Sequence, residues 1–174
     1  MAILNVYRNS YQQSKRWEDI IRKVWNDEAA INRQYCKCNP YNADTIIHSF
    51  KMIHSSYSNF NSILVHCFSI DFESVSNMET MVRIINEVLM LYGESFQIIA
   101  VLCKKEDRYV ATFVLNAVSY NTGRKFHDNN RAYIELMNHL KNLFQLEIRC
   151  SIAEPVLFTD GPTASNYTNI LGKK

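Results

Sequence analysis

The chain has 174 residues, of which 47% are hydrophobic, and this is enough to build the core of one compact domain. Its formal net charge of +2 excludes a strongly basic protein, so any nucleic-acid binding must come from local clusters of basic residues. No run of about 18 apolar residues occurs and the N-terminus lacks a signal-peptide pattern, so we expect no membrane-spanning helix and a cytoplasmic location.

The first half of the chain carries one strand pattern and two helix patterns. Residues 2–7 have the composition of a short strand. The capping pattern Ser10-x-x-Gln13 introduces an amphipathic helix over about 13–27. Apolar residues at helical spacing predict a second helix over about 42–55.

The second half of the chain predicts four strands and two helices. The runs of strand length that are rich in β-forming residues are 63–70, 96–103, 109–118 and 147–153. One long helix follows the capping pattern Ser76-x-x-Glu79 and ends at Gly93. The other follows Asn129 and Asn130. The charged turn between the second and third of these strands is short, so we expect them to form an antiparallel hairpin.

This order of elements predicts an α/β (α+β) fold. We expect a central, mostly antiparallel sheet of about five strands, with helices packed mainly on one face. The other face would then be available for a ligand or a partner. We expect one domain over residues 1–158 and a loosely structured C-terminal tail over 159–174.

The cysteines and histidines do not form a recognisable metal site. Five cysteines at scattered positions do not suggest a disulfide framework, and the close pair Cys36 and Cys38 has no further ligands at zinc spacing. His48 and His54 are six residues apart, which puts them on different faces of their helix. His66, inside an apolar strand, is interpreted as a core histidine, with a catalytic or ligand role as the alternative. We therefore predict no metal and no cofactor.

Four motifs, in a defined order, carry a family resemblance. They are Ile21–Glu28 (IRKVWNDE), Tyr35–Ala43 (YCKCNPYNA), Val65–Phe72 (VHCFSIDF) and Phe113–His127 (FVLNAVSYNTGRKFH). With the element order over about residues 1–150, they resemble the nuclease domain of conjugative relaxases of the plasmid-mobilisation, MobA-like class. The first two are similar to the family's charged turn after a helix and to its Cys-Asn-Pro helix entry. The last two are similar to its His-x-x-x-Ser-Phe strand and to its strand, asparagine and glycine turn.

The resemblance implies a family chemistry whose key residues are replaced in this chain. Family members cut one DNA strand with a tyrosine, beside a metal ion held by three histidines. The histidine positions, aligned backwards from Asn116, fall on Cys103, Val110 and Thr112, and the tyrosine position falls on Lys23. A valine cannot bind a metal, and a lone cysteine with a threonine is a poor set of ligands for a divalent cation. The resemblance thus implies a relaxase scaffold that lacks the histidine triad and the catalytic tyrosine.

Basic and aromatic residues around the predicted hairpin are candidate DNA contacts. Lys105 stands where the family has an acidic residue, and basic residues at such a site favour a phosphate over a cation. The DNA-binding candidates are Lys104, Lys105, Arg108, Asn116, Arg124 and Lys125. Tyr109 and Tyr120 are candidates for stacking on unpaired bases, with ordinary packing as the alternative. Asn116 either bonds the backbone of a neighbouring loop or contacts DNA directly.

Three functions remain open on this sequence. The favoured one is a catalytically inactive relaxase homologue in a bacterial mobile genetic element, which binds a single-stranded or hairpin transfer origin or a relaxosome protein. One alternative is a protein-interaction or regulatory module, as a homodimer, that binds no nucleic acid. Another is a DNA-nicking relaxase with a rearranged site, in which Tyr7 or Tyr11 replaces the nucleophile. Such a site would require side chains such as those of Glu106, Asp107, His66 and Tyr109 to converge.

Overall fold

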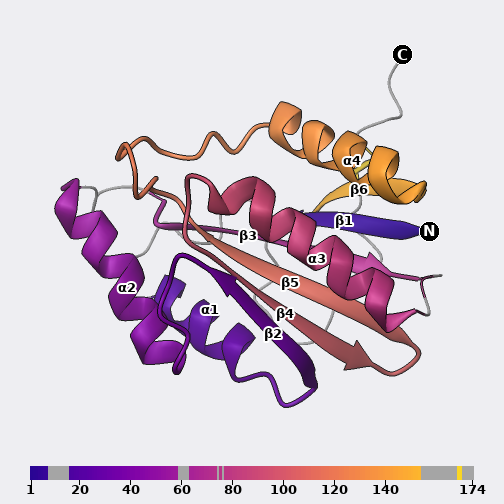
Figure 1. The fold of residues 1–174 in the computed structure, drawn as a ribbon, viewed down its shortest axis with the longest axis horizontal. Helices are drawn as coiled ribbons and strands as arrows, with labels where there is room; N and C mark the ends of the chain where they lie inside the picture. The colour runs from indigo at the N-terminus through magenta and orange to yellow at the C-terminus, as the bar shows by residue number, and fades with distance from the viewer. Residues whose placement is uncertain (8–15, 59–62, 74, 76, 154–167, 170–174) are drawn as a thin grey trace.

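In the computed structural model, the described residues are 1–7, 16–58, 63–73, 75, 77–153 and 168–169 (Figure 1). Within them, seven strands form one sheet in the order β2-β4-β5-β3-β1-β6-β7. The strands are β1 (Ala2–Tyr7), β2 (Ala30–Cys36), β3 (Val65–Phe72), β4 (Ile98–Lys105), β5 (Arg108–Asn116), β6 (Ile148–Ala153) and β7 (Thr168–Asn169). The helices are α1 (Arg16–Trp25), α2 (Ala43–Ser56), α3 (Met78–Gly93) and α4 (Asn130–Phe144). Only β1 and β6 pair in parallel among these strands.

The predicted α/β (α+β) class and the mostly antiparallel sheet are confirmed. The sheet is larger than the five strands expected, since β2 and the two-residue β7 were not predicted. β2 is an edge strand that pairs with β4, and its side chains alternate between half-buried and exposed. Because an edge strand buries little, β2 has no apolar run of the kind that marks β3 and β4 in the sequence.

Helices lie on both faces of the sheet rather than mainly on one. One face, which includes Leu4, Phe68 and Phe113, forms a core with α3 and α4. The opposite face forms a second core with α1 and α2, and its strand residues come from β3, β4 and β5. All eight residues of β3 are buried, as expected for a strand that is covered on both faces. α1 and α2 therefore pack on the β3, β4 and β5 part of their face, and β1 and β6 lie beside it.

Local signals in the sequence start several of the helices. Asn42 caps α2 in a capping box with Thr45, and the Asn129 side chain accepts from the backbone N–H of Ala132 at the start of α4. Asn77 caps α3 by accepting from the backbone N–H of Glu79. The predicted capping residues Ser76, Ser10 and Gln13 lie outside the described residues, as does the tail over 159–174 apart from β7.

The predicted hairpin is confirmed as β4 and β5, which pair antiparallel from Ile98 opposite Leu115 to Lys105 opposite Arg108. Its two-residue turn is Glu106-Asp107, where Glu106 has a φ of 48°. None of the described helices combines the length and the apolar character that crossing a membrane requires.

Candidate functional site

The three positions assigned to metal ligands by resemblance lie side by side in the sheet. Cys103 on β4 is directly opposite Val110 on β5, and Thr112 follows two residues later. Side chains two residues apart on a strand point to the same face, so all three share the face that carries α1 and α2. Cys103 is buried, while Val110 and Thr112 are half-buried.

The side chains at these positions do not fit a divalent metal ion. Val110 offers no donor atom, and burial together with the Asp27 carboxylate raises the pKa of the Cys103 thiol to about 11. This shift disfavours the thiolate, which is the form that a metal binds. Across the described part of the chain, no group of three or more His, Cys, Asp or Glu side chains is arranged to hold a metal ion.

A row of polar side chains continues across this face from Thr112. Ser69 on β3 is opposite Thr112, Asn5 on β1 is opposite Ser69, and Ser151 on β6 is opposite Asn5. Asp71 follows two residues after Ser69 and so points to the same face. We call Asn5, Ser69, Asp71, Thr112 and Ser151 the polar face.

Asp71 is the charged group of the polar face, and sequence reasoning did not single it out. Its side chain is only 7% exposed and accepts a hydrogen bond from Arg108 Nη1 at 2.7 Å. Burial raises the pKa of Asp71, and the Arg108 guanidinium offsets only part of this effect. The signal that could have found it is a lone acid within the apolar strand VHCFSIDF, because a buried carboxylate requires a partner.

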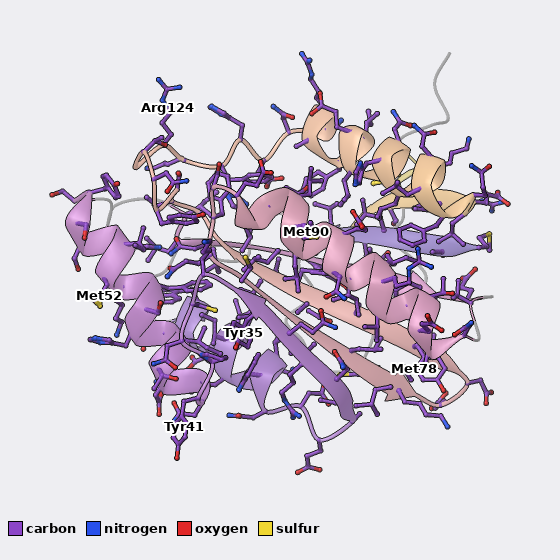
Figure 2. The ribbon with its side chains drawn as sticks, viewed as in Figure 1. Tyr35, Tyr41, Met52, Met78, Met90 and Arg124 are labelled. Atoms are coloured by element: carbon purple, nitrogen blue, oxygen red, sulfur yellow. The ribbon has the colours of Figure 1, made fainter. Side chains whose placement is uncertain are left out.

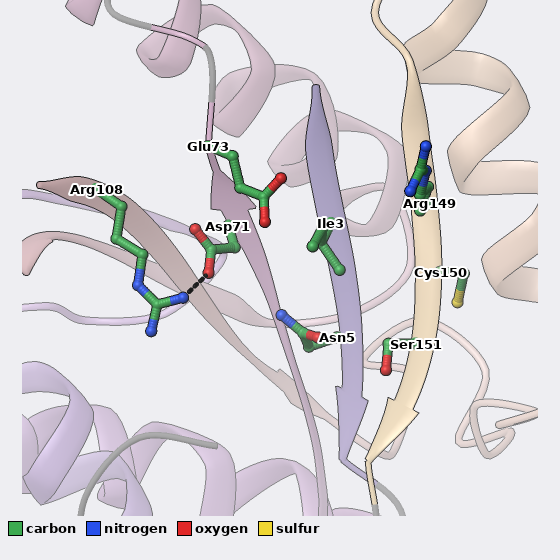
Figure 3. Close-up of a pocket in the computed structure, with 8 residues that line it drawn as sticks. All are labelled: Ile3, Asn5, Asp71, Glu73, Arg108, Arg149, Cys150 and Ser151. Atoms are coloured by element: carbon green, nitrogen blue, oxygen red, sulfur yellow. Dashed lines mark hydrogen bonds and ion pairs between the residues drawn. The ribbon is translucent and has the colours of Figure 1, made fainter. Parts of the chain in front are cut away.

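A cavity of about 300 Å³ lies over the polar face at its β6 side (Figure 3). It is lined by Ile3, Asn5, Asp71, Glu73, Arg108, Arg149, Cys150 and Ser151. Four strands contribute to it, and β1 runs between β3 and β6 in Figure 3. Of the predicted site residues, the structure brings only Arg108 into this cavity.

The basic candidates separate into two groups at opposite ends of β5, which corrects the expectation of one cluster at a hairpin end. Lys104, Lys105 and Arg108 lie at the β4–β5 turn and are exposed. Arg124 and Lys125 follow the other end of β5, roughly 25 Å away at about 3.3 Å per residue. The bridge between Val118 and Lys125 turns this segment back, and Arg124 lies far from the hairpin turn in Figure 2.

Asn116 is completely buried, with an exposed fraction of 0%, so its side chain cannot reach a DNA strand. It accepts from His54 Nε2 at 2.6 Å and donates to Gln97 Oε1 at 2.9 Å. These bonds join β5 to α2 and to the start of β4. Asn116 therefore has a structural role, and the alternative that it contacts DNA directly is wrong.

Comparison with protein families identifies the scaffold that carries this geometry. The sequence model of the relaxase nuclease domain of the MobA/VirD2-like type matches residues 11–146, which is well over half of the chain. This chain belongs to the MobA/VirD2-like relaxase family. The resemblance to relaxases predicted from the four motifs is thereby confirmed. Searches of curated proteins and of solved structures gave no significant match.

The tyrosines of this relaxase-family domain lie in different surroundings. Tyr7 is on the polar face side of β1, and its hydroxyl lies 2.9 Å from Ser69 Oγ. Tyr11 lies outside the described residues. The Tyr120 hydroxyl donates to the carbonyl oxygen of Gly93 at 2.9 Å, and Tyr109 packs against the α3–α4 core. Both stacking candidates are thus engaged in packing, and neither belongs to the polar face of the relaxase domain.

The residues suggested for a rearranged relaxase site do not converge. His66 faces the α3–α4 side of the sheet, where its Nδ1 lies 3.5 Å from Asp128 Oδ2 and its ring packs edge-on against Phe126. Tyr109 faces the same side but lies at the far end of β3, opposite Phe72. Glu106 and Asp107 are exposed at the hairpin turn. Asp128 is a partner for His66 that the sequence did not reveal, since 62 residues separate the two.

The cysteine pair at the end of β2 does not resemble a metal site either. Cys36 and Cys38 are both half-buried, and each thiol points to a backbone carbonyl oxygen, of Gly93 and of Ile98. Burial, together with the neighbouring Cys36, raises the pKa of Cys38 to about 12. The contacts with carbonyl oxygens and the raised pKa of Cys38 both favour packed thiols over metal ligands.

Proposed function

We propose that this relaxase-family domain is catalytically inactive and binds DNA in the mobilisation of a plasmid or conjugative element, in the cytoplasm of a bacterial cell. The observation that carries the proposal is the set of side chains at the three histidine positions of the resemblance. Cys103, Val110 and Thr112 share one face, as ligands would, but they offer one thiol, one hydroxyl and no imidazole. Cleavage through a metal-polarised phosphate needs donors that this set lacks.

The DNA half of the proposal is supported by charge at the hairpin turn. Lys104 and Lys105 are exposed at the end of β4, next to Arg108 on β5. Such residues bind the phosphate backbone without regard to sequence. Since the net charge of the chain is only +2, this local group is the better candidate for DNA contact than the molecule as a whole.

Binding of a single-stranded oligonucleotide at increasing salt concentration tests the proposal. Each phosphate contact on a single strand contributes about −0.7 to the slope of log K against log salt. We expect the double substitution Lys104→Gln with Lys105→Gln to reduce the magnitude of this slope by up to about 1.4. The matched control, Arg131→Gln with Lys141→Gln, removes the same charge from α4, outside the hairpin turn, and should leave the slope unchanged. Absence of binding by the wild-type protein at low salt would remove the DNA half of the proposal.

A nicking relaxase with a rearranged site is the second candidate, because Tyr7 lies beside the polar face with its hydroxyl 2.9 Å from Ser69 Oγ. Nicking of supercoiled plasmid DNA in the presence of Mg²⁺ or Mn²⁺ distinguishes the two candidates. The proposal expects no nicking. Cleavage that persists through purification and disappears in Tyr7→Phe would replace it with the nicking function.

The protein-interaction module is the remaining alternative, and the partner of the domain is then a relaxosome protein or a second copy. Large apolar side chains are exposed on several elements, as Figure 2 shows for Tyr35, Met52 and Met90. Scattered exposed residues of this kind are normal on a monomer. Light scattering tests this alternative, since a stable dimer in the absence of DNA, together with no oligonucleotide binding, would favour it.

A further inference from the structure

β2 forms one edge of the sheet, and no described strand lies beyond it (Figure 1). At the other edge, β7 covers part of β6 through Ser151 and Ile152. Natural proteins usually protect an edge strand with lysine, proline or a bulge, because its free backbone groups can pair with another strand. β2 (AINRQYC) contains neither lysine nor proline, and its one irregularity lies between Ala30 and Asn32. The described residues therefore leave the regular part of this edge, residues 32–36, open to a further strand.

The hydrogen bonds of β4 show which backbone groups of β2 point outward. Asn116 donates its backbone N–H to the carbonyl oxygen of Gln97 at 2.8 Å, and Lys104 donates its backbone N–H to that of Ala29 at 3.1 Å. Successive residues of an inner antiparallel strand bond to alternate neighbours. The odd-numbered residues of β4 therefore bond to β5, and the even-numbered ones bond to β2.

Arg33 and Tyr35 direct their backbone N–H and C=O groups away from the sheet. They lie opposite odd-numbered residues of β4, whereas Gln34 lies opposite Ala100 and bonds to β4. The side chains of Arg33 and Tyr35 are exposed on the face that carries α1 and α2, and Tyr35 is 51% exposed (Figure 2). A further strand at this edge would thus meet two backbone donors and two backbone acceptors.

The sequence of this edge is complementary to itself in an antiparallel arrangement. A two-fold axis at Gln34 puts Arg33 of each copy directly opposite Tyr35 of the other, and the outward backbone groups of both residues then pair. The two Gln34 side chains meet on the α3 face, where each amide can donate to the other and accept from it.

The Arg33 side chain is already fixed where the second copy would meet it. Its Nε donates to the carbonyl oxygen of Trp25 at 2.7 Å, and its Nη2 donates to that of Asp27 at 3.2 Å. The guanidinium can therefore attract the Tyr35 ring of the second copy with little further loss of side-chain entropy.

The neighbouring register fits less well. A two-fold axis at Arg33 would place two guanidinium groups opposite each other, and like charges in directly opposite positions are destabilising. It would also extend the pairing to Ile31, which lies within the irregularity between Ala30 and Asn32. An axis at Gln34 avoids both costs.

An exposed methionine lies beside the same edge. Met90 is 67% exposed and precedes Gly93 by three residues, so it lies on the side of α3 where Gly93 approaches Cys36 of β2 (Figure 2). A second copy at the edge would cover part of this side chain and add apolar burial to the backbone pairing.

We propose that the domain forms a homodimer in which β2 strands of two copies pair antiparallel around Gln34, so that one sheet continues through both copies. The inference goes beyond the proposed function and does not depend on DNA binding. Pairing over residues 32–36 buries less area than a permanent dimer requires, so we expect a weak dimer with a dissociation constant in the micromolar range.

Sedimentation velocity of the full chain at increasing concentration tests the dimer. Tyr35→Lys puts a lysine opposite Arg33 of the second copy and should raise the dissociation constant at least ~10-fold, whereas Tyr35→Glu puts a carboxylate there and should keep it within ~3-fold of the wild-type value. Tyr41→Lys makes the same change at a position that is 85% exposed and outside β2, and it should have no effect.

Three results would overturn the proposal. They are a wild-type protein that stays monomeric up to several hundred micromolar, a Tyr35→Lys protein that dimerises as well as the wild type, and equal weakening by Tyr35→Lys and Tyr35→Glu. The last result would exclude the pairing of Tyr35 with Arg33.

Amide hydrogen exchange tests the edge without any substitution. The backbone N–H groups of Arg33 and Tyr35 should exchange rapidly in dilute protein and become protected at concentrations where the dimer dominates. Gln34 is the internal control, because its bond to β4 should protect it under both conditions. Protection of Arg33 and Tyr35 already in the dilute monomer would show that the edge is covered within one chain, and this would also overturn the proposal.

Discussion

At the scale of single residues, the side chain of Asn116 connects three elements. Its Oδ1 accepts from the backbone N–H of Val118 at 3.1 Å, which fixes the oxygen on that side of the amide. His54 must therefore donate from Nε2 to the same oxygen. Gln97, the partner of Asn116 Nδ2, donates in turn to Ser49 Oγ at 2.7 Å. The network holds α2 against the ends of β4 and β5.

Asn116→Leu tests this network, since it keeps the shape of the side chain but removes its hydrogen bonds. His54 and Gln97 would each be left with an unpaired buried group, and we expect a loss of about 2–4 kcal/mol in the free energy of unfolding. Urea unfolding measures the loss. Asn142→Leu, at an exposed position on α4, should change stability by less than about 0.5 kcal/mol. A similarly small effect at Asn116 would contradict the role given to the network.

His54 makes stability depend on pH. Burial lowers the pKa of His54 below its ordinary value, and Lys125 adds to this, although the bond to Asn116 works in the other direction. The unfolded chain then binds a proton more readily than the folded one, so stability falls as pH decreases through the ordinary histidine range. We expect the melting temperature to drop between about pH 7.5 and pH 5.5, and His54→Gln to flatten this drop. If the melting temperature of His54→Gln falls with pH as much as that of the wild-type protein, groups other than His54 cause the pH dependence.

At the scale of elements, α3 lies in close contact with β2 at Gly93. This residue is the last of the helix, and a Cβ built on it would overlap Cys36 Sγ and lie 3.0 Å from Cys36 Cβ. The glycine is therefore required for the contact between the helix and the edge strand. Its backbone is helical and Glu94 follows in the right-handed region, so a left-handed cap does not explain it.

Gly93→Ala is expected to destabilise the protein by about 1–3 kcal/mol, because overpacking outweighs the higher helix propensity of alanine. The double variant Gly93→Ala with Cys36→Ala lacks the sulfur atom that the new Cβ would meet. It should therefore regain part of the free energy of unfolding that Gly93→Ala loses. Chemical unfolding of the two single variants and the double variant gives the coupling between the sites. Strictly additive effects would show that Cys36 is not the group that Gly93 accommodates.

At the scale of the whole molecule, the sheet brings four segments that are distant in the chain to one face. β4 and β5 carry the positions to which the resemblance assigns the histidines, β3 carries Asp71, and β1 and β6 carry Asn5 and Ser151. The chain thus belongs to the relaxase family, and Cys103, Val110 and Thr112 offer few donor atoms for a metal ion on this face.

Restoring imidazoles tests whether the frame still has the geometry of a metal site. In the triple variant Cys103→His, Val110→His, Thr112→His, the register brings three imidazoles to one face. We expect millimolar Zn²⁺ to raise its melting temperature by several degrees and EDTA to reverse the rise. A control with Tyr109→His in place of Val110→His puts one imidazole on the other face and should respond less. No response of the triple variant would mean that the three positions do not converge.

The sequence by itself determined the elements that depend on local signals, and it determined the family. Asn42, Asn129 and the short charged turn set α2, α4 and the hairpin, since caps and tight turns act within a few residues. The assignment of the histidine positions to Cys103, Val110 and Thr112 rests only on the motifs and their spacing, and it stays a prediction.

Only the tertiary structure decided which polar groups meet. Asn116 became a core residue because α2 and β4 supply its partners, and Arg124 separated from Lys105 because β5 spans the distance between them. Asn5 and Ser151 are 146 residues apart, and no local pattern relates them. Both residues line one cavity because β1 pairs with β6, and strand pairing between distant segments of the chain depends on the whole sheet.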